Sequence, residues 1–410
     1  MSSHGNMVSD NPGLATYILI IDGTVVPGKY GIGRMSVSRE FNRIPTATII
    51  IPDGDAARQM FDGSNEDFFI PGKEIEIKIG YKTREQSIFK GIIVSHSVKI
   101  EQNFTSLVIV CKDKAFKMTL GRKSRIFYES RDSDAIETLI ADAGLVADVE
   151  ATSQTHHELV QYASSDWDFM VSRAQVCGRL CLAGDGTITV KKPDFSQSPV
   201  MNAEFGRNIF TFDAEIDARN QFSSYKATTW DFSGQAIADT DAANPAINRA
   251  GNLSESDLAT ASGSITCELK HTGYLKPEIL QEWVDAKSSL QQLSKIRGRV
   301  QLQGDSILKP GQLLNLKGIS DRFNGAVLIS GVLHTLSEGN WLSDVQFGIK
   351  PEWFAELYNI NPLPASGMIP AVHGLQIGVV TALEGDPDNE YRIRVKIPIV
   401  NNEEEGIWAR

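Results

Sequence analysis

The sequence lacks the features that mark several large classes of protein. No apolar run reaches the roughly 18 residues that a membrane-spanning helix needs. The first residues, MSSHGNMVSDNPG, are polar and lack the apolar centre of a signal peptide. The 410-residue chain has four scattered cysteines, which argues against a disulfide framework. These absences predict assembly in the cytoplasm, with no signal peptide, reduced thiols and no stable membrane insertion.

Positive charge is also scarce. Forty Lys and Arg residues stand against 51 Asp and Glu residues, so the net charge is −11. An acidic surface repels phosphate backbones, and we therefore expect no nucleic-acid partner. One stretch, YRIRVKIPIV, alternates apolar residues with three basic ones, Arg392, Arg394 and Lys396. It leaves open an alternative function, an OB-fold nucleic-acid binder that stacks bases on Tyr391 and Trp408.

Catalytic motifs are missing as well: the sequence has no GxGxxG, P-loop, GxSxG or HExxH. His156-His157, followed by Asp166 and Asp168, supplies metal-ligand residue types, but adjacent histidines on an extended chain point to opposite faces. We therefore expect a protein that is not an enzyme, with no catalytic residue, metal or cofactor. A second alternative, a cell-wall polysaccharide hydrolase of a tail baseplate, would need converging carboxylates and would involve His156 and Asp168.

What the sequence does contain is mainly β-strand pattern. YILIIDGTVV (17–26) predicts a hairpin that turns at Asp22-Gly23, and EIEIKI (74–79) alternates strictly. Further strands are predicted at 47–51, 89–100 and 105–113. Many short strands with turn signals between them indicate a barrel or a sandwich.

Helical patterns interrupt the strands in two places. Residues 134–144 and 165–177 predict two helices of a small α/β insert, followed by a hairpin that turns at Gly184-Asp185-Gly186. Strands resume after residue 206, and the composition of 233–264 predicts a long loop.

The third predicted helix, 277–295, carries a short heptad pattern. Its apolar residues are spaced 4, 3, 4 and 3 apart: Ile279, Trp283, Ala286, Leu290 and Leu293. This face fits either the core of its own domain or a contact with a partner subunit, and the spacing alone leaves both readings open.

Four stretches resemble one family in the family's own order. QYASSDWDFMVSRAQVCGRLCLAGDGTITVKKPD (161–194) resembles the signature of VgrG, the type VI secretion spike protein, and of the related late-control D-like hubs of contractile phage tails. MTLGRKSRIFYESRDSDAIETLIADAGL (118–145) is similar to the segment before it. Residues 308–348 resemble the family's second barrel, and 373–410 resemble the opening of its OB-fold.

The resemblance implies a fold class that is mainly β: two hub-type barrels, an α/β insert and the start of an OB-fold. The expected division is a flexible N-terminal tail, a first barrel, the insert, a second barrel with its helix, a linker and a partial OB-fold: 1–13, 14–120, 121–205, 206–350, 351–372 and 373–410. The family's β-helix needle is absent from this chain, so a spike is expected to follow beyond Arg410.

The resemblance also implies function and partners. Hubs of this family are homotrimers in which six barrels form a pseudo-sixfold ring that joins the hexameric tube protein to the threefold spike. Baseplate proteins, and a conical tip protein and effectors carried by the missing spike, are further expected partners. The chain is expected in the bacterial cytoplasm during assembly and then in a secreted or extracellular contractile particle. The resemblance does not distinguish between type VI secretion, an extracellular injection particle and a phage.

Arg392, Arg394 and Lys396 are expected to face a neighbouring subunit, with the Glu403-Glu404-Glu405 run as a candidate partner.

Overall fold

The structure, a computed structural model, describes residues 13–102, 104–243, 250–368, 375, 377–399 and 405–409. The chain forms two compact units, Met1–Ile360 and Asn361–Arg410, which are described separately. No helix in these described ranges is both long and apolar enough to cross a membrane.

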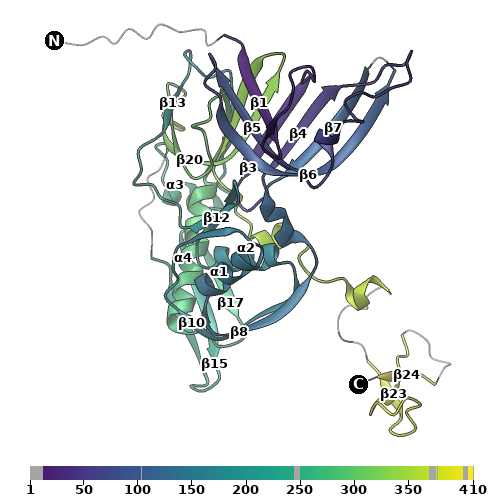
Figure 1. The fold of residues 1–410 in the computed structure, drawn as a ribbon. Helices are drawn as coiled ribbons and strands as arrows, with labels where there is room; N and C mark the ends of the chain where they lie inside the picture. The colour runs from purple at the N-terminus through teal and green to yellow at the C-terminus, as the bar shows by residue number, and fades with distance from the viewer. Residues whose placement is uncertain are drawn as a thin grey trace. The chain divides into compact units, whose positions relative to one another are not determined.

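The first unit is built on one 13-stranded sheet, which confirms the mainly β fold class (Figure 1). Its first half contains β1 (Ala15–Ile21), β2 (Thr24–Val25), β3 (Arg34–Glu40), β4 (Thr46–Pro52), β5 (Glu74–Tyr81), β6 (Gln86–Glu101) and β7 (Phe104–Lys112). Its second half contains β13 (Met201–Glu204), β14 (Thr211–Ile216), β18 (Ile296–Gln303), β19 (Leu313–Lys317), β20 (Gly325–Ser337) and β21 (Asn340–Phe347). The predicted hairpin at Asp22-Gly23 joins β1 to β2, with both turn residues at positive φ.

The two halves have the same strand order. In the first half the neighbours run β3-β4-β7-β6-β5-β1, and in the second half they run β14-β18-β21-β20-β19-β13. Each half therefore places its successive strands in the order 2-3-6-5-4-1. The last of the five strand pairs differs, because β1 pairs antiparallel with β5 whereas β13 pairs parallel with β19. The sheet is thus an internal duplication, apart from β2, which extends β1.

A single strand, β20, belongs to both halves. Its first part pairs with β19, and its second part, Gly331–Ser337, pairs with β3 of the first half. Side chains of β20 and β21 accordingly enter two cores: Leu336 and Trp341 pack in the first half, and Ile329 and Val345 in the second.

The insert packs two helices against two small sheets. Its elements are β8 (Lys123–Arg131), α1 (Asp132–Asp142), β9 (Val146–Val149), β10 (Thr155–Ser164), α2 (Asp166–Val176), β11 (Leu180–Gly184) and β12 (Thr187–Lys191). Helix α1 begins two residues before the predicted start, and α2 begins after Ser165, whose Oγ accepts a hydrogen bond from the Asp168 backbone N–H at 3.1 Å.

Polar contacts dock the insert onto the first half of the sheet. At the β11–β12 turn, Asp185 Oδ1 accepts from Arg39 Nη2 at 2.7 Å and from the Lys90 backbone N–H at 3.1 Å. The Asn42 backbone N–H donates to the Cys181 carbonyl, and the Cys181 backbone N–H donates to Asn42 Oδ1. The hairpin that the sequence predicts is therefore also the attachment point of the insert.

The second half carries its own insertion between β14 and β18. A three-stranded sheet covers one side of α4 (Pro277–Ser294), the helix predicted over 277–295. Its strands are β15 (Ser224–Asp231), β16 (Ala236–Asp241) and β17 (Thr266–His271). The prediction of a long loop over 233–264 is wrong in part, because this range contains β16, α3 (Glu255–Ala259) and a 3-10 turn at Thr260–Ser262. The stabilisation from the cross-strand pairs between β15 and β16 outweighs the preference of this segment's residues for turns.

Short elements complete the two units. Further 3-10 turns lie at Asp67–Phe69, Lys114–Thr119 and Pro364–Gly367, and α5 (Phe354–Leu357) packs Phe354 into the core of the insert. The second unit holds one antiparallel sheet where the start of an OB-fold was predicted, formed by β22 (Val379–Ala382), β23 (Ile393–Lys396) and β24 (Ile407–Ala409).

A buried ionic network joins the two helices and β10 of the insert. Asp132 accepts hydrogen bonds from Arg173 Nε at 2.6 Å and from His156 Nε2 at 2.7 Å. Burial alone would raise the pKa of Asp132, but the His156 hydrogen bond and the Arg173 charge outweigh it and hold that pKa below its usual range. The carboxylate is therefore the counter-charge on which Arg173 depends.

His334 occupies the place where β20 crosses between the halves. Its Nδ1 lies 2.8 Å from Ser343 Oγ, and its ring stacks at a tilt against Trp341 with centroids 5.6 Å apart. Burial, with the nearby Arg39 charge, lowers the pKa of His334 to about 3. The imidazole is therefore neutral at pH 7.

Replacing Asp132 by Asn is expected to destabilise the chain by about 3–5 kcal/mol, because Arg173 loses its buried counter-charge. The matched control is Asp134→Asn in the same helix turn. Asp134 pairs with Arg131 at the surface, and its loss should cost less than about 1 kcal/mol. Urea unfolding of both variants measures these losses. Equal losses in the free energy of unfolding would contradict a special role for the buried network.

His334 is expected to make the protein sensitive to mild acid. Below about pH 6.5 the unfolded chain takes up a proton on this residue that the folded chain refuses, so the free energy of unfolding falls as the pH drops towards 3. The contribution is about 1.4 kcal/mol per pH unit. His334→Asn should flatten the pH dependence of the urea midpoint between pH 7 and 5, whereas His157→Asn, at an exposed position, should not. An unchanged slope in His334→Asn would refute the expectation.

Candidate interaction surfaces

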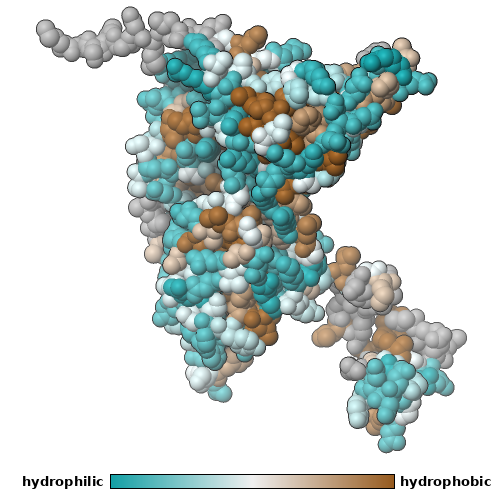
Figure 2. Space-filling view, viewed as in Figure 1, coloured by the Kyte–Doolittle hydropathy of each residue, from teal (hydrophilic) through white to brown (hydrophobic). Residues whose placement is uncertain are grey.

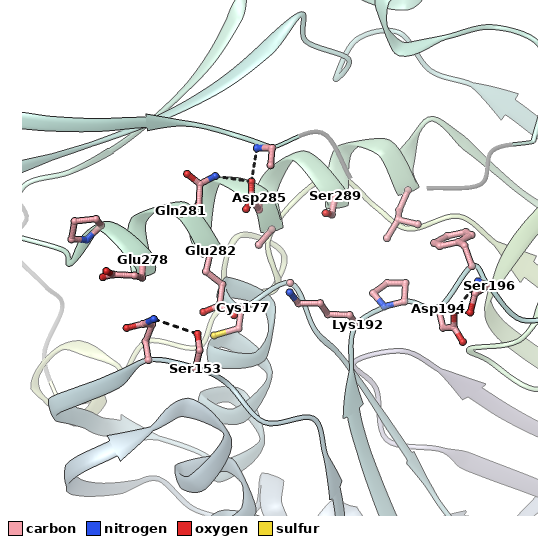
Figure 3. A pocket seen from close by; sticks show the side chains of 18 residues that line it. Ser153, Cys177, Lys192, Asp194, Ser196, Glu278, Gln281, Glu282, Asp285 and Ser289 are labelled. Carbon is pink, nitrogen blue, oxygen red and sulfur yellow. Dashed lines mark hydrogen bonds between the residues drawn. The ribbon is translucent and has the colours of Figure 1, made fainter. Parts of the chain in front are cut away.

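A cleft of about 1030 Å³ lies between α4 and the insert (Figure 3). Helix α4 lines it with a polar row that follows its helical repeat: Glu278, Gln281, Glu282, Asp285 and Ser289. The insert and the segment after it supply the residues opposite: Ser153, Cys177, Lys192, Asp194 and Ser196. The cleft is thus acidic on its helical side.

The polar groups of this cleft are engaged in holding elements together. Asp285 Oδ1 accepts hydrogen bonds from the Ala243 backbone N–H at 2.7 Å and from Gln281 Nε2 at 3.0 Å. Glu282 pairs at 3.0 Å with Arg179, a buried guanidinium that also donates to the carbonyl of Cys177. The cleft therefore marks a joint between the insert and α4.

The thiol in the cleft is a poor nucleophile. Burial, followed by the nearby Asp132 carboxylate, raises the pKa of Cys177 well above its ordinary value, so the thiol stays protonated. His156, a candidate for metal binding or hydrolysis, is held by Asp132, and His157 pairs with Glu129. Asp166 binds Lys123 at 2.5 Å. In the part of the chain that the structure describes, no cluster of three or more His, Cys, Asp and Glu side chains could hold a metal ion.

The structure divides the apolar face predicted on α4. Ala286, Leu290 and Leu293 are buried within the chain, whereas Ile279 and Trp283 are only half-buried. Near its start the helix buries Leu280 and Val284 instead, against the β15–β17 sheet. The face is therefore rotated along the helix, and contact of its exposed part with a partner subunit stays a prediction.

The basic residues predicted to face a neighbour have partners in their own chain. Arg392 Nη2 lies 2.6 Å from Asp386 Oδ1, and Nε lies 3.6 Å from Glu390. Hydrogen bonding to Arg392 lowers the pKa of Asp386 below its ordinary value. These contacts fix the loop that leads into β23.

The remaining basic positions lie on β23. Arg394 pairs with Glu405 of the same chain, and its guanidinium lies 5.8 Å from the centre of the Trp408 ring. Lys396 is half-buried at the end of the strand. Glu403 and Glu404 lie outside the described residues. A role of this strand between subunits stays a prediction.

The open edges of the large sheet were not anticipated from the sequence. Strand β14 pairs only with β18, and β6 beyond Ser95 pairs only with β7, among the strands that the structure describes. On that part of β6, Val98 is 40% exposed and Ile100 is 71% exposed. The difference in strand length accounts for the free edge, since β6 has 16 residues and its neighbour β5 has eight. Unpaired strand edges beside exposed apolar residues are typical of surfaces that pair with another chain.

The sequence was compared with family models and with curated proteins. The family model described as "Alg8 N-terminal domain" matches residues 11–338, which is most of the chain. The search of curated proteins finds no match.

Three solved tail proteins share the fold. The 43 kDa tail protein of prophage MuSo2 from Shewanella oneidensis superposes with a TM-score of 0.59 at 11% identity, covering 82% of this chain and 98% of that one. The tail protein from Neisseria meningitidis MC58 gives 0.59 at 16% identity with the same coverage. Prophage tail protein gp18 from Listeria monocytogenes EGD-e gives 0.51 at 8% identity, covering 84% and 97%.

At these identities the superpositions establish the fold. They agree with the resemblance to contractile-tail hubs found in the sequence, which is confirmed. The chain therefore belongs to the family described as the Alg8 N-terminal domain and has the fold of phage tail proteins.

Proposed function

We propose that this chain is the hub subunit of a bacterial contractile injection machine. Three copies form a ring that joins the sixfold inner tube to a threefold spike and helps the machine to puncture a target envelope and deliver effectors. The observation that carries the proposal is the duplicated sheet, in which, among the described strands, β14 and the far part of β6 have an open edge.

The pairing of β20 with β3 inside one chain is the template for the strand pairing that we propose between chains. Strands β6 and β20 each contain a bulge, at Val94 and at Ser330. Near these bulges β6 stops pairing with β5, and β20 stops pairing with β19. Beyond its bulge, β20 pairs antiparallel with β3. By the same rule the far part of β6 pairs with the equivalent of β3, which is β14, and that strand belongs to the next copy.

The equivalence of the halves predicts the register of the proposed junction. His334 pairs with Val37 inside the chain. Following the ladders across each half makes Val98 the counterpart of His334, and Ala214 the counterpart of Val37. The expected partners between copies are Val98 with Ala214, Ile100 with Phe212, and Lys99 with Asp213.

The side chains at these positions suit the proposed pairing. Val98, Ile100, Ala214 and Phe212 lie on one face and bring four apolar side chains together. On the other face, Lys99 meets Asp213, a carboxylate that is 81% exposed in the single chain. Apolar and opposite-charge pairs across strands each stabilise a sheet.

Three copies joined in this way present six equivalent halves. A head-to-tail contact closes into a ring only when its rotation divides the circle, and three chains with doubled halves approximate sixfold symmetry. Such a ring fits a hexameric tube on one side and a threefold spike on the other. Tube protein, baseplate proteins, tip protein and effectors are therefore the partners that we propose.

The role is mechanical rather than catalytic in this proposal. The ionic groups of the cleft and of the insert fasten elements to one another, which supports a part that transmits force. The chain would assemble in the cytoplasm and then act within an extracellular or secreted particle.

Engineered cysteines test the junction. The double variant Val98→Cys/Ala214→Cys, treated with a short bis-maleimide, should give linked dimers and closed trimers of the 45.0 kDa chain on a denaturing gel. The control Val98→Cys/Thr211→Cys moves the second thiol three residues along β14, onto its other face, and should link far more slowly. Products that grow beyond three chains, or equal linking in the control, would contradict the ring.

A further inference from the structure

Residues 349–360, which we call the strap, lead from the end of β21 to the end of the first unit at Ile360. The chain passes from the strap directly into the second unit, which begins at Asn361. A pull on the second unit along the backbone therefore reaches the strap before it reaches the large sheet. What holds the strap decides whether that pull is passed on to β21.

The start of the strap is bound to α4. The Ile349 backbone N–H donates a hydrogen bond to the Leu293 carbonyl at 3.1 Å, and the Pro351 carbonyl accepts one from Lys287 Nζ at 3.2 Å. Lys287 Nζ also lies 5.1 Å from the centre of the Trp353 ring, within the range of a cation–π contact. This part of the strap is therefore fixed to the helix at several successive positions.

The middle of the strap enters the core of the insert. Phe354, the first residue of α5, is 6% exposed and packs in that core. Its backbone N–H donates to Gln175 Oε1 of α2 at 2.6 Å, in a buried site. Figure 2 shows hydrophobic surface close to the place where Figure 1 labels α2. Pulling Phe354 out would expose an aromatic side chain to water and break a buried hydrogen bond, so this is the firmest point of the strap.

The end of the strap is tied to two further parts of the first unit. Arg43, in the turn between β3 and β4, donates from Nη2 to Tyr358 OH at 2.8 Å. Arg122, which precedes β8, donates from Nη1 to the Ile360 carbonyl at 2.6 Å and to the Ala163 carbonyl of β10 at 2.8 Å. The strap thus contacts α4, the insert and the first half of the sheet in turn.

The first half of the sheet has an equivalent exit. Following the strand ladders makes Phe347 of β21 the counterpart of Cys111 of β7. Seven residues after each of them lie Phe354 and Met118, which are therefore counterparts too. Both are buried in the core of the insert. The insert receives the chain where it leaves each half of the sheet, and the strap is the second of these exits.

We propose that the strap is the mechanical anchor of the second unit. Force that arrives at Ile360 is carried by the strap into α4 and the insert, so that β21 and the large sheet stay closed. Hydrogen bonds at the protein surface are individually weak, but here they lie in series with the buried Phe354 side chain. The inference rests on the proposed function, in which the chain transmits force, and adds the path that the force takes.

Stretching single full-length chains tests this path. One handle is a tag at the C-terminus, and the other is attached at Asn340→Cys, an exposed position beside the β20–β21 turn. A Cys267→Ser background removes the one native cysteine that is not fully buried. Beyond the extension of the second unit, a separate step of up to about 40 Å should mark release of the strap, the length that its residues can span.

The lifetime of the closed strap at constant force should depend on its contacts. Gln175→Met should shorten that lifetime by about fivefold or more, because the Phe354 N–H is left buried without an acceptor. Tyr358→Phe should shorten it by a smaller factor, since it removes a hydrogen bond at the surface. The matched control, Tyr128→Phe, removes the same hydroxyl at a 66% exposed position of β8 and should leave the lifetime unchanged.

The outcomes separate this inference from the proposed function. Opening of the large sheet without an earlier strap step, or an unchanged lifetime in both strap variants, would overturn the anchor. Tyr358→Phe alters only a surface contact, so it decides the question even where Gln175→Met fails to fold. Linking of Val98→Cys/Ala214→Cys should persist in the Tyr358→Phe background. A strap step in a chain that forms no linked trimers would support the anchor and refute the hub.

Discussion

The constraint on which the rest of the structure depends is the sharing of β20 between two halves of one sheet. A strand of 13 residues is long enough to pair with β19 at its start and with β3 along its remainder. Side chains alternate along a strand, so each part of β20 directs every second residue towards one core. The part paired with β19 contributes to the core of the second half, and the part paired with β3 contributes to the core of the first half. Leu336 and Ile329 meet this demand from opposite ends of the same strand. The halves are therefore held in one relative position by backbone hydrogen bonds, which suits a part that carries load.

Ion pairs, some buried and one at the surface, hold the elements of the first unit together. Asp132 ties α1 to α2 and β10, Arg179 ties the insert to α4, and Asp185 ties it to the first half of the sheet. Such pairs contribute little net stability over apolar contacts, but breaking one leaves an uncompensated charge. They make the attachment of the insert specific. The histidine, cysteine and carboxylate side chains that gather in the insert are engaged in these structural contacts.

Because the sheet is duplicated, the same kind of strand junction can form within one chain and between two chains. The β20–β3 junction is satisfied within the chain, whereas its counterpart at β6 and β14 is left open among the strands that the structure describes. An open strand edge is an aggregation hazard unless it is matched to a defined partner. The polar face of this edge, with Lys99 and Asp213, restricts what can pair with it. The internal repeat and the assembly that we propose therefore use the same strand junction.

Local signals in the sequence determined the individual elements. The Asp22-Gly23 turn, the alternation of 74–79, the Ser165 cap and Pro277 at the start of α4 each act over a few residues, and each element formed where predicted. The resemblance of four stretches to contractile-tail hubs predicted the mainly β fold class. Tertiary structure decided the rest, because it depends on contacts between distant residues: the pairing of β20 with β3, the rotation of the α4 face onto the β15–β17 sheet, and the partners of Arg392 and Arg394. The edges of β6 and β14 belong to this second group. A sequence pattern shows that a segment forms a strand, but only the three-dimensional ladder shows which of its edges is left without a neighbour.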